Sequence, residues 1–187
     1  MKVLVTGANG FIGSNLVSRF ETEDDVEVIK FTRQSTLNEL NLALLSVDFI
    51  CHTAGVNRPN DDVEFEKVNA DLTKILCDAV RKANRKIPIM FTSSVHVEND
   101  NKYGISKLAA ETHLLEYAEK NNTPVYIFRL SHVIGKWCRP NYNSVVSTFC
   151  HNIARDIPIQ INDPTYQLKL VYIDDFIDTI FKIINKE

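Results

Sequence analysis

Three glycines between an apolar strand and a helix constrain the fold of this chain most. The β-branched run KVLVT at 2–6 leads into TGANGFIG at 6–13, where the glycines are spaced GxxGxxG. In such a turn Gly7 permits the tight bend, Gly10 lets a pyrophosphate approach the backbone, and Gly13 lets the helix pack closely on the strand. The free N–H groups and partial positive charge of the helix N-terminus suit a phosphate. The turn therefore predicts a dinucleotide-binding fold.

The alternation of apolar runs and helical patterns continues to about residue 130. Runs that are apolar on both faces and separated by helices indicate a parallel sheet covered on both sides. Right-handed crossovers then favour a doubly wound α/β (Rossmann) fold, with an NAD(P)-binding domain over residues 1–134. The expected strands are 2–6, 26–31, 47–53, 87–92 and 124–130, and the expected helices are 11–20, a short one around 37–45, 63–84 and 103–121.

The pattern changes after about residue 135. An amphipathic stretch at 145–153 is followed by proline-containing sequence and then by a helical pattern, DDFIDTIFKIINKE, at 174–187. This segment follows the later strands, and folds of this kind bind ligands at the carboxyl ends of their strands. Residues 135–187 are therefore predicted to be a partial, truncated substrate-binding subdomain.

Composition excludes several classes of protein. The 21 Lys and Arg against 24 Asp and Glu give a net charge of −3, which argues against nucleic-acid and anionic-membrane partners. No apolar run approaches the roughly 20 residues that span a bilayer, and the first residues enter a strand rather than a signal peptide, so we expect a cytoplasmic protein. The cysteines form no CxxC and the histidines no HxH or HExxH, so no metal site is predicted. Cys51 and Cys77 are expected to be small buried hydrophobes.

The residues after the second strand bear on the type of dinucleotide. NAD-binding proteins place Asp or Glu there to bind the ribose hydroxyls, and that acid would repel a 2′-phosphate. Residues 30–35, KFTRQS, contain no acid. Arg33 can pair with a phosphate, although it can also be an ordinary solvated loop arginine. The pattern favours NADP(H) and leaves NAD(H) open.

A tyrosine and a lysine four residues apart suggest the chemistry. Tyr103 and Lys107, in YGISK, face the same side of a helix. A free phenol has a pKa of about 10, and a nearby ammonium together with an oxidised nicotinamide favours the phenolate. Ser94, which ends FTSS after the fourth strand, can bind the substrate oxygen that Tyr103 protonates. The alternative is a Tyr and a Lys on a solvated face, but the order of these elements predicts one catalytic site.

Six motifs match one family: TGANGFIG at 6–13, DFICHTAG at 48–55, Asn69, FTSS at 91–94, YGISK at 103–107 and YIDD at 172–175. In combination they resemble the extended short-chain dehydrogenases/reductases, the NAD(P)-dependent epimerase/dehydratase family, that act on nucleotide sugars. The resemblance implies that Tyr103 is the catalytic acid/base, that Lys107 binds the nicotinamide ribose and tunes Tyr103, and that Ser94 orients the substrate. The expected cofactor contacts are Gly7, Asn9, Gly10, Phe11, Ile12, Gly13, Arg33, Ala54, Gly55, Val56, Asn69, Thr92, Ser93, Tyr103 and Lys107.

Two further segments, HTAGVNRP at 52–59 and GKWCRPNYNSVVSTFC at 135–150, resemble the CapF family of capsular-polysaccharide and O-antigen enzymes. In that family a reductase domain precedes a zinc-dependent cupin that performs 3-epimerisation, and the cupin is expected to be absent from this chain. The resemblance implies a homodimer and the NADPH-dependent reduction, at C4, of a UDP-linked 2-acetamido-2,6-dideoxy-4-ketohexose on the way to N-acetyl-L-fucosamine. The expected substrate contacts are Asn57, Arg58, His132, Lys136, Arg139, Tyr142 and Asn143.

The chain departs from relatives at two positions. His132 stands where the family commonly has Asn, and residues 167–169 read QLK where many sugar epimerases carry an Arg that holds the diphosphate. Two other readings stay open. One is an NAD-dependent sugar epimerase or dehydratase that retains its hydride, and the other is a non-catalytic dinucleotide-binding sensor.

Overall fold

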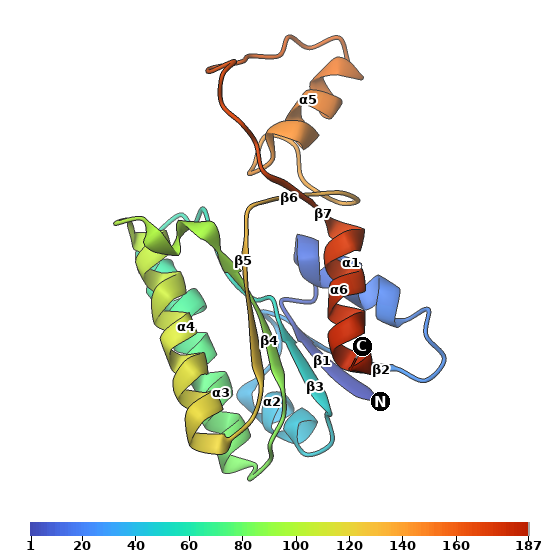
Figure 1. The fold of residues 1–187 in the computed structure, drawn as a ribbon, viewed down its shortest axis with the longest axis vertical. Coiled ribbons are helices and arrows are strands. Elements are labelled where there is room, and N and C mark those ends of the chain that lie inside the picture. Colours follow the sequence, from blue (N-terminus) through green and yellow to red (C-terminus); the bar gives the residue numbers. More distant parts are fainter. Residues whose placement is uncertain (187) are drawn as a thin grey trace. The chain divides into compact units, whose positions relative to one another are not determined.

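The computed structural model describes residues 1–186, which fall into two compact units, Met1–Arg129 and Leu130 onward. The first unit is a sheet with helices on its two faces, and the second is a smaller unit of two short strands and two helices (Figure 1). Within residues 1–186 no helix is both long and apolar enough to cross a membrane.

The central sheet has the strand order β2-β1-β3-β4-β5. Pairing is parallel between β1 and β2, β1 and β3, and β3 and β4. The chain first steps from β1 to β2 and then crosses back to β3 on the other side of β1, which creates the switch point where such sheets bind ligands. The doubly wound parallel sheet predicted from the sequence is thus confirmed. The strands are β1 (Lys2–Thr6), β2 (Glu27–Phe31), β3 (Phe49–His52), β4 (Ile89–Ser94) and β5 (Val125–Leu130).

The helices of the first unit are α1 (Phe11–Phe20), α2 (Leu37–Leu44), α3 (Leu72–Lys82) and α4 (Lys102–Asn121). Figure 1 shows α1 on one face of the sheet and the other three on the opposite face, as right-handed crossovers require when the strand order reverses. The helix expected at 63–84 differs in one respect, because it begins with a π-helical segment, η1 (Phe65–Asp71). A short 3₁₀ turn, η2 (Val95–Glu98), joins β4 to α4.

Apolar side chains from β1, β3 and β4 pack against α2, α3 and α4 to form the core. Leu4, Ile50 and Ile89 are fully buried there, and the hydroxyl of buried Tyr117 donates to the carbonyl of Ile87 at 2.9 Å. Cys51 and Cys77 are both buried, and burial raises the pKa of each thiol. The prediction that they are small buried hydrophobes is confirmed.

Strand β2 is an edge of the five-stranded sheet, and charged side chains flank it. Lys30 Nζ lies 2.7 Å from Glu21, and Lys2 Nζ lies 2.9 Å from Glu27. Both pairs are exposed to solvent.

The second unit contains a two-stranded parallel sheet, β6 (His132–Ile134) with β7 (Leu170–Tyr172), and the helices α5 (Val145–Ile153) and α6 (Ile173–Asn185). The final helical pattern is a helix, as predicted, and the amphipathic stretch at 145–153 is also helical. Glu187 lies outside the described residues. A Cβ on Gly135, whose φ is +143°, would lie 2.3 Å from Ile173 Cγ2. The start of α6 thus requires a glycine after β6.

Candidate active site

The glycine turn between β1 and α1 has the geometry that the spacing predicts. Gly7 has φ +68°, and a Cβ there would lie 2.7 Å from the backbone nitrogen of Ala54. A Cβ on Gly13 would lie 2.2 Å from the carbonyl oxygen of Gly7, so neither position has room for a side chain. A Cβ on Gly10 would meet only that same oxygen, at 3.1 Å, and Gly10 is exposed. Gly7 and Gly13 therefore serve packing, while Gly10 leaves open space.

The open end of α1 fits a pyrophosphate. Gly10 is its N-cap, no side chain caps the helix, and the first turn contains no acid, so its first N–H groups and its partial positive charge are available to an anion. The neighbouring predicted contacts are accessible, since Asn9 is exposed and Phe11 and Ile12 are half-buried.

Behind this turn, buried side chains are joined by hydrogen bonds. His52 Nδ1 lies 2.6 Å from Thr6 Oγ1, and His52 Nε2 lies 2.8 Å from Thr73 Oγ1. The Thr73 hydroxyl donates to the carbonyl of Asn69 at 2.6 Å, so it accepts from Nε2–H and leaves Nδ1 to accept from Thr6. Thr6 in turn accepts from the backbone N–H of Ala54 at 3.3 Å.

Burial, assisted by the charge of Lys107, lowers the pKa of His52 to about 3, so the ring is neutral. The sequence reasoning missed His52. The available signal was a polar residue inside a strand, FICH, that is otherwise fully apolar.

Asn69, on η1, fixes the loop that follows β3. Its Oδ1 accepts from the N–H of Val56 at 2.8 Å, and its Nδ2 donates to the carbonyl of Val56 at 2.9 Å and to Ser106 Oγ at 3.0 Å. A Cβ on Gly55 would lie 3.0 Å from Asn69 Oδ1 and 3.3 Å from Lys107 Nζ. The glycine therefore keeps the space beside the lysine clear, at the carboxyl edge of the sheet.

The three residues predicted to be catalytic meet where β4 and α4 come together. Ser94 Oγ accepts from the N–H of His96 at 3.1 Å. Burial raises the pKa of Tyr103, and the nearby side chain of Ser94 acts in the opposite direction. Lys107 Nζ donates to the carbonyl of Thr92 at 2.7 Å. The arrangement can present a phenol and a hydroxyl to one substrate oxygen, next to an ammonium.

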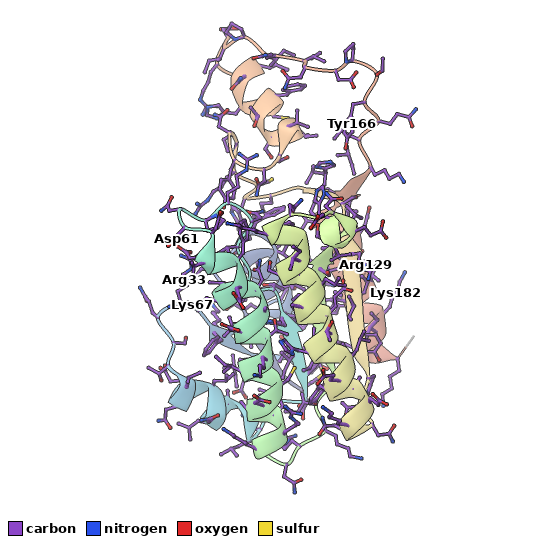
Figure 2. All side chains as sticks on the ribbon, turned by 90° about the vertical axis from the view of Figure 1, so that its left-hand side faces the viewer. Arg33, Asp61, Lys67, Arg129, Tyr166 and Lys182 are labelled. Carbon is purple, nitrogen blue, oxygen red and sulfur yellow. The ribbon has the colours of Figure 1, made fainter. Side chains whose placement is uncertain are left out.

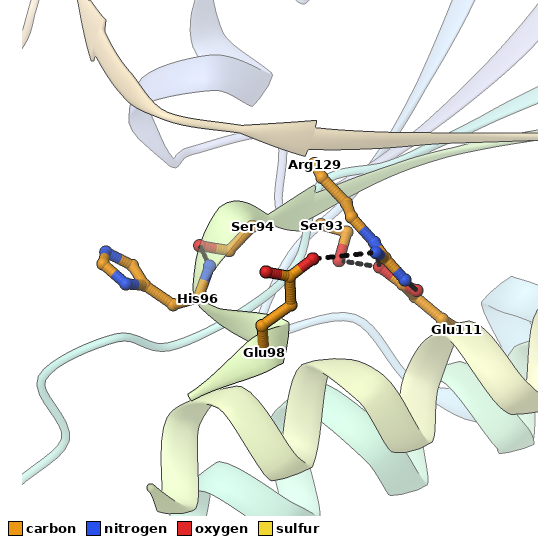
Figure 3. Close-up of polar contacts among 6 residues, drawn as sticks. All are labelled: Ser93, Ser94, His96, Glu98, Glu111 and Arg129. Atoms are coloured by element: carbon orange, nitrogen blue, oxygen red, sulfur yellow. Dashed lines mark hydrogen bonds and ion pairs between the residues drawn. The ribbon is translucent and has the colours of Figure 1, made fainter. Parts of the chain in front are cut away.

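The electrostatics around Lys107 involve residues that the sequence reasoning did not single out. Burial lowers the pKa of Lys107 to about 8, and the charge of Glu111 acts against that shift. Glu111 is buried, accepts from Ser93 Oγ, and receives two bonds from Arg129, at 3.1 and 2.8 Å (Figure 3). The hydroxyl hydrogen of Ser93, a predicted cofactor contact, is thus committed to Glu111.

Arg33 stands in the exposed loop after β2 (Figure 2). The loop is ordered by its own side chains, since the N–H of Thr32 donates to Ser35 Oγ at 3.0 Å and the N–H of Gln34 donates to Thr32 Oγ1 at 3.3 Å. Two predicted substrate contacts of the first unit, Asn57 and Arg58, are exposed in the loop after β3.

The other predicted substrate contacts belong to the second unit, which has a cavity of about 430 Å³. His132 is half-buried in β6, whereas Lys136, Arg139, Tyr142 and Asn143 are exposed and do not line this cavity. Its lining, missed at the sequence level, consists of Ile134, Gly135, Cys138, Pro140, Val146, Ser147, Cys150, His151 and Tyr172. Across residues 1–186 no three His, Cys, Asp or Glu side chains group in a way that could hold a metal.

The model of the NAD dependent epimerase/dehydratase family matches residues 3–187. The chain belongs to this family. The family assignment made from the motifs is thereby confirmed. Because the family is NAD dependent, its cofactor belongs to the nicotinamide dinucleotides.

Two relatives are similar over almost the whole chain. A "UDP-2-acetamido-2,6-beta-L-arabino-hexul-4-ose reductase" from Pseudomonas aeruginosa is 55% identical over 185 residues, which cover 99% of this chain and 50% of the relative. The crystal structure of the capsular polysaccharide assembling protein CapF from Staphylococcus aureus has a TM-score of 0.87 and 43% identity, covering 99% of this chain and 50% of that one. This chain therefore spans about half the length of each.

A more distant structure supports the fold alone. UDP-glucuronic acid 4-epimerase from Bacillus cereus, solved in complex with NAD, has a TM-score of 0.86 at 22% identity, covering 99% of this chain and 74% of that one. The Rossmann-like architecture predicted from the sequence is confirmed by this match and by CapF.

Proposed function

We propose that this chain is the reductase part of an enzyme that reduces the C4 keto group of a UDP-linked 2-acetamido-2,6-dideoxy-4-ketohexose with NADPH, in the synthesis of an N-acetyl-L-fucosamine precursor of a surface polysaccharide. The observation that carries the proposal is that the side chains of Tyr103 and Ser94 interact next to buried Lys107, whose ammonium donates to the carbonyl of Thr92. The similarity to the Pseudomonas aeruginosa reductase, at 55% identity, supports the substrate class.

In the proposed mechanism Ser94 and Tyr103 together hold the keto oxygen of the substrate. Tyr103 donates its proton to that oxygen as the carbonyl becomes an alcohol. A reduced nicotinamide, when bound, supplies the hydride. Lys107 binds the adjacent ribose, and its positive charge favours the tyrosinate left after proton transfer. Gly7, Gly10 and Gly13 bring the first strand and helix close to the pyrophosphate.

The preference for NADPH rests on the loop after β2. Arg33 is exposed there, and residues 30–35 include no carboxylate that would repel a 2′-phosphate. A guanidinium pairs well with a phosphate through bidentate hydrogen bonds.

The remaining assignments form part of the same proposal. Residues 1–134 hold the cofactor, and residues 135–187 contribute part of the sugar-nucleotide site. The enzyme acts as a homodimer in the cytoplasm, where NADPH and nucleotide sugars are made. The proposed substrate contacts are Asn57, Arg58, His132, Lys136, Arg139, Tyr142 and Asn143.

The decisive experiment uses the complete protein from which this chain comes. The UDP-4-ketohexose is added with NADPH, and oxidation of NADPH is followed at 340 nm while the sugar product is identified by NMR. We expect stoichiometric NADPH consumption and a C4 alcohol. An epimerase or dehydratase would instead carry tightly held NAD, detectable by mass spectrometry, and would convert its sugar with no net consumption of NADPH. A dinucleotide-binding sensor would bind the cofactor and convert no sugar.

A further inference from the structure

Glu111 lies one helical turn beyond Lys107 on α4 and has no part in the mechanism above. Tyr103, Lys107 and Glu111 are each four residues apart, so they follow one face of the helix. The residue is only 3% exposed. A carboxylate this deeply buried is costly unless hydrogen bonds and a counter-charge compensate it.

Ser93 and Arg129 supply that compensation. Ser93 Oγ donates to Oε1 of Glu111, and Arg129 donates from Nε at 3.1 Å and from Nη2 at 2.8 Å (Figure 3). A two-bonded guanidinium fixes both the orientation and the charge of a carboxylate. Although burial alone would raise the pKa of Glu111, the bonds from Arg129 and Ser93 and the charges of Arg129 and Lys107 hold it below its usual range. Glu111 is therefore a fixed anion.

Lys107 and Glu111 also bind successive residues of β4. Lys107 Nζ donates to the carbonyl of Thr92, and Glu111 accepts from the side chain of Ser93. The two contacts hold successive turns of α4 against the end of the strand that carries Ser94. A change at Glu111 therefore affects the place where Lys107 is held.

The charged and titratable groups around Lys107 come from several elements. His52, on β3, is neutral, because burial lowers its pKa and its Nδ1 accepts from the Thr6 hydroxyl. Arg129, on β5, pairs with Glu111 and also lies 3.8 Å from exposed Glu98, on η2. Tyr103 lies one turn before Lys107 on α4. Of these groups, Glu111 supplies the negative charge that acts against the effect of burial on Lys107.

We propose that Glu111 is a positioning residue of this site: its carboxylate, held by Ser93 and Arg129, keeps Lys107 seated against β4 in the ammonium form and so sets the upper pH limit of the site. The consequence for cofactor binding rests on the proposed function, but the effect on Lys107 itself does not.

The direct test measures the protonation of Lys107 by NMR. The protein is labelled with ¹³C at lysine Cε, the Lys107 signal is assigned through a Lys107→Met variant, and each variant is titrated from pH 6 to 11. Glu111→Gln keeps the shape of the side chain and removes its charge, so the Lys107 midpoint should fall by about one pH unit. Arg129→Gln removes the two bonds and the charge that keep the Glu111 carboxylate ionised, so the Lys107 midpoint should fall in this variant too. Glu119→Gln, the same charge change at an exposed position of α4, should leave it unchanged.

A lower midpoint in both Glu111→Gln and Arg129→Gln, with an unchanged midpoint in Glu119→Gln, supports the proposal, because both variants weaken the same anion. An unchanged midpoint in Glu111→Gln overturns it. Circular dichroism shows whether each variant folds. If Glu111→Gln does not fold, the Arg129→Gln titration decides, and a midpoint that does not fall overturns the proposal.

A second measurement separates this inference from the proposed function. NADPH affinity is followed by fluorescence titration over the same pH range, and its alkaline limit should move with the Lys107 midpoint. If the midpoint moves in Glu111→Gln while NADPH affinity keeps the pH dependence of the parent, the role of Glu111 stands and the assignment of Lys107 to the cofactor fails.

Discussion

The side chains of Tyr103 and Ser94 interact although they come from different elements, the first turn of α4 and the last residue of β4. They place an acid and an oxygen-binding hydroxyl together on the carboxyl edge of the sheet. This pairing also leads to the most direct prediction about catalysis.

Tyr103→Phe should lower turnover by about 10²–10⁴-fold, the usual worth of a positioned general acid. Only a hydroxyl is removed, so the NADPH affinity of the variant should stay within about twofold of the parent's. The rate is measured by NADPH oxidation in the complete enzyme. Tyr166→Phe, at an exposed tyrosine of the second unit, is the control. A Tyr103→Phe variant that works at the parent rate would show that another group is the acid.

Arg33→Ala should weaken NADPH binding by about 5- to 100-fold, the range expected for losing a charge-assisted bond to phosphate. NADH lacks that phosphate, so its affinity should hardly change. Fluorescence titrations of both cofactors with the parent and the variant check this. Equal affinities of the parent for NADPH and NADH would contradict the proposed preference.

Two glycine substitutions should separate packing from ligand binding. Gly13→Ala forces a methyl group against the carbonyl of Gly7, so the free energy of unfolding in urea should fall by about 1–3 kcal/mol. Gly10→Ala has more room and should cost less than about 1 kcal/mol. Its methyl group would stand where the pyrophosphate approaches, so NADPH affinity should drop markedly. A Gly13→Ala variant with the same free energy of unfolding as the parent would show that Gly13 is not required for packing.

His52 should make the free energy of unfolding depend on pH. The ring titrates near pH 6.5 when unfolded, while its folded pKa is about 3. Between these values the unfolded chain binds more protons, so stability is complete above about pH 6.5 and is lost as the pH falls. Replacing His52 with Gln should make the decline between pH 6.5 and 4.5 shallower by up to about 1.4 kcal/mol per pH unit. Urea unfolding at several pH values measures this, and parallel curves would refute it.

The strands, the glycine turn and the spacing of Tyr103 and Lys107 could be predicted because local sequence determines them. Apolar periodicity marks what each element buries, and a four-residue interval on a helix always places two side chains on one face. The π-helical start of the helix at 65–71 could not be predicted. It turns Asn69 toward Val56 and Ser106, and partners so distant in sequence leave no trace in the periodicity.

Glu111 and Arg129 were missed for a related reason. A glutamate on a helix and an arginine near the end of a strand are ordinarily solvated, so each looks like a surface charge when read alone. Only the fold shows that the two side chains pair and that Ser93 completes the set. In the second unit the sequence misled in the opposite direction. The polar side chains of exposed loop residues suggested ligand contact, but the cavity of that unit is lined by their less polar neighbours.

The charged pairs along β2 have a consequence for how copies of this protein meet. An edge strand offers unpaired backbone groups to any other strand, and this is a common route to aggregation. Here Lys30 with Glu21, and Lys2 with Glu27, place ionic groups along that edge. A second molecule adding a strand there would have to desolvate them. These charges therefore oppose sheet-to-sheet fusion at this edge.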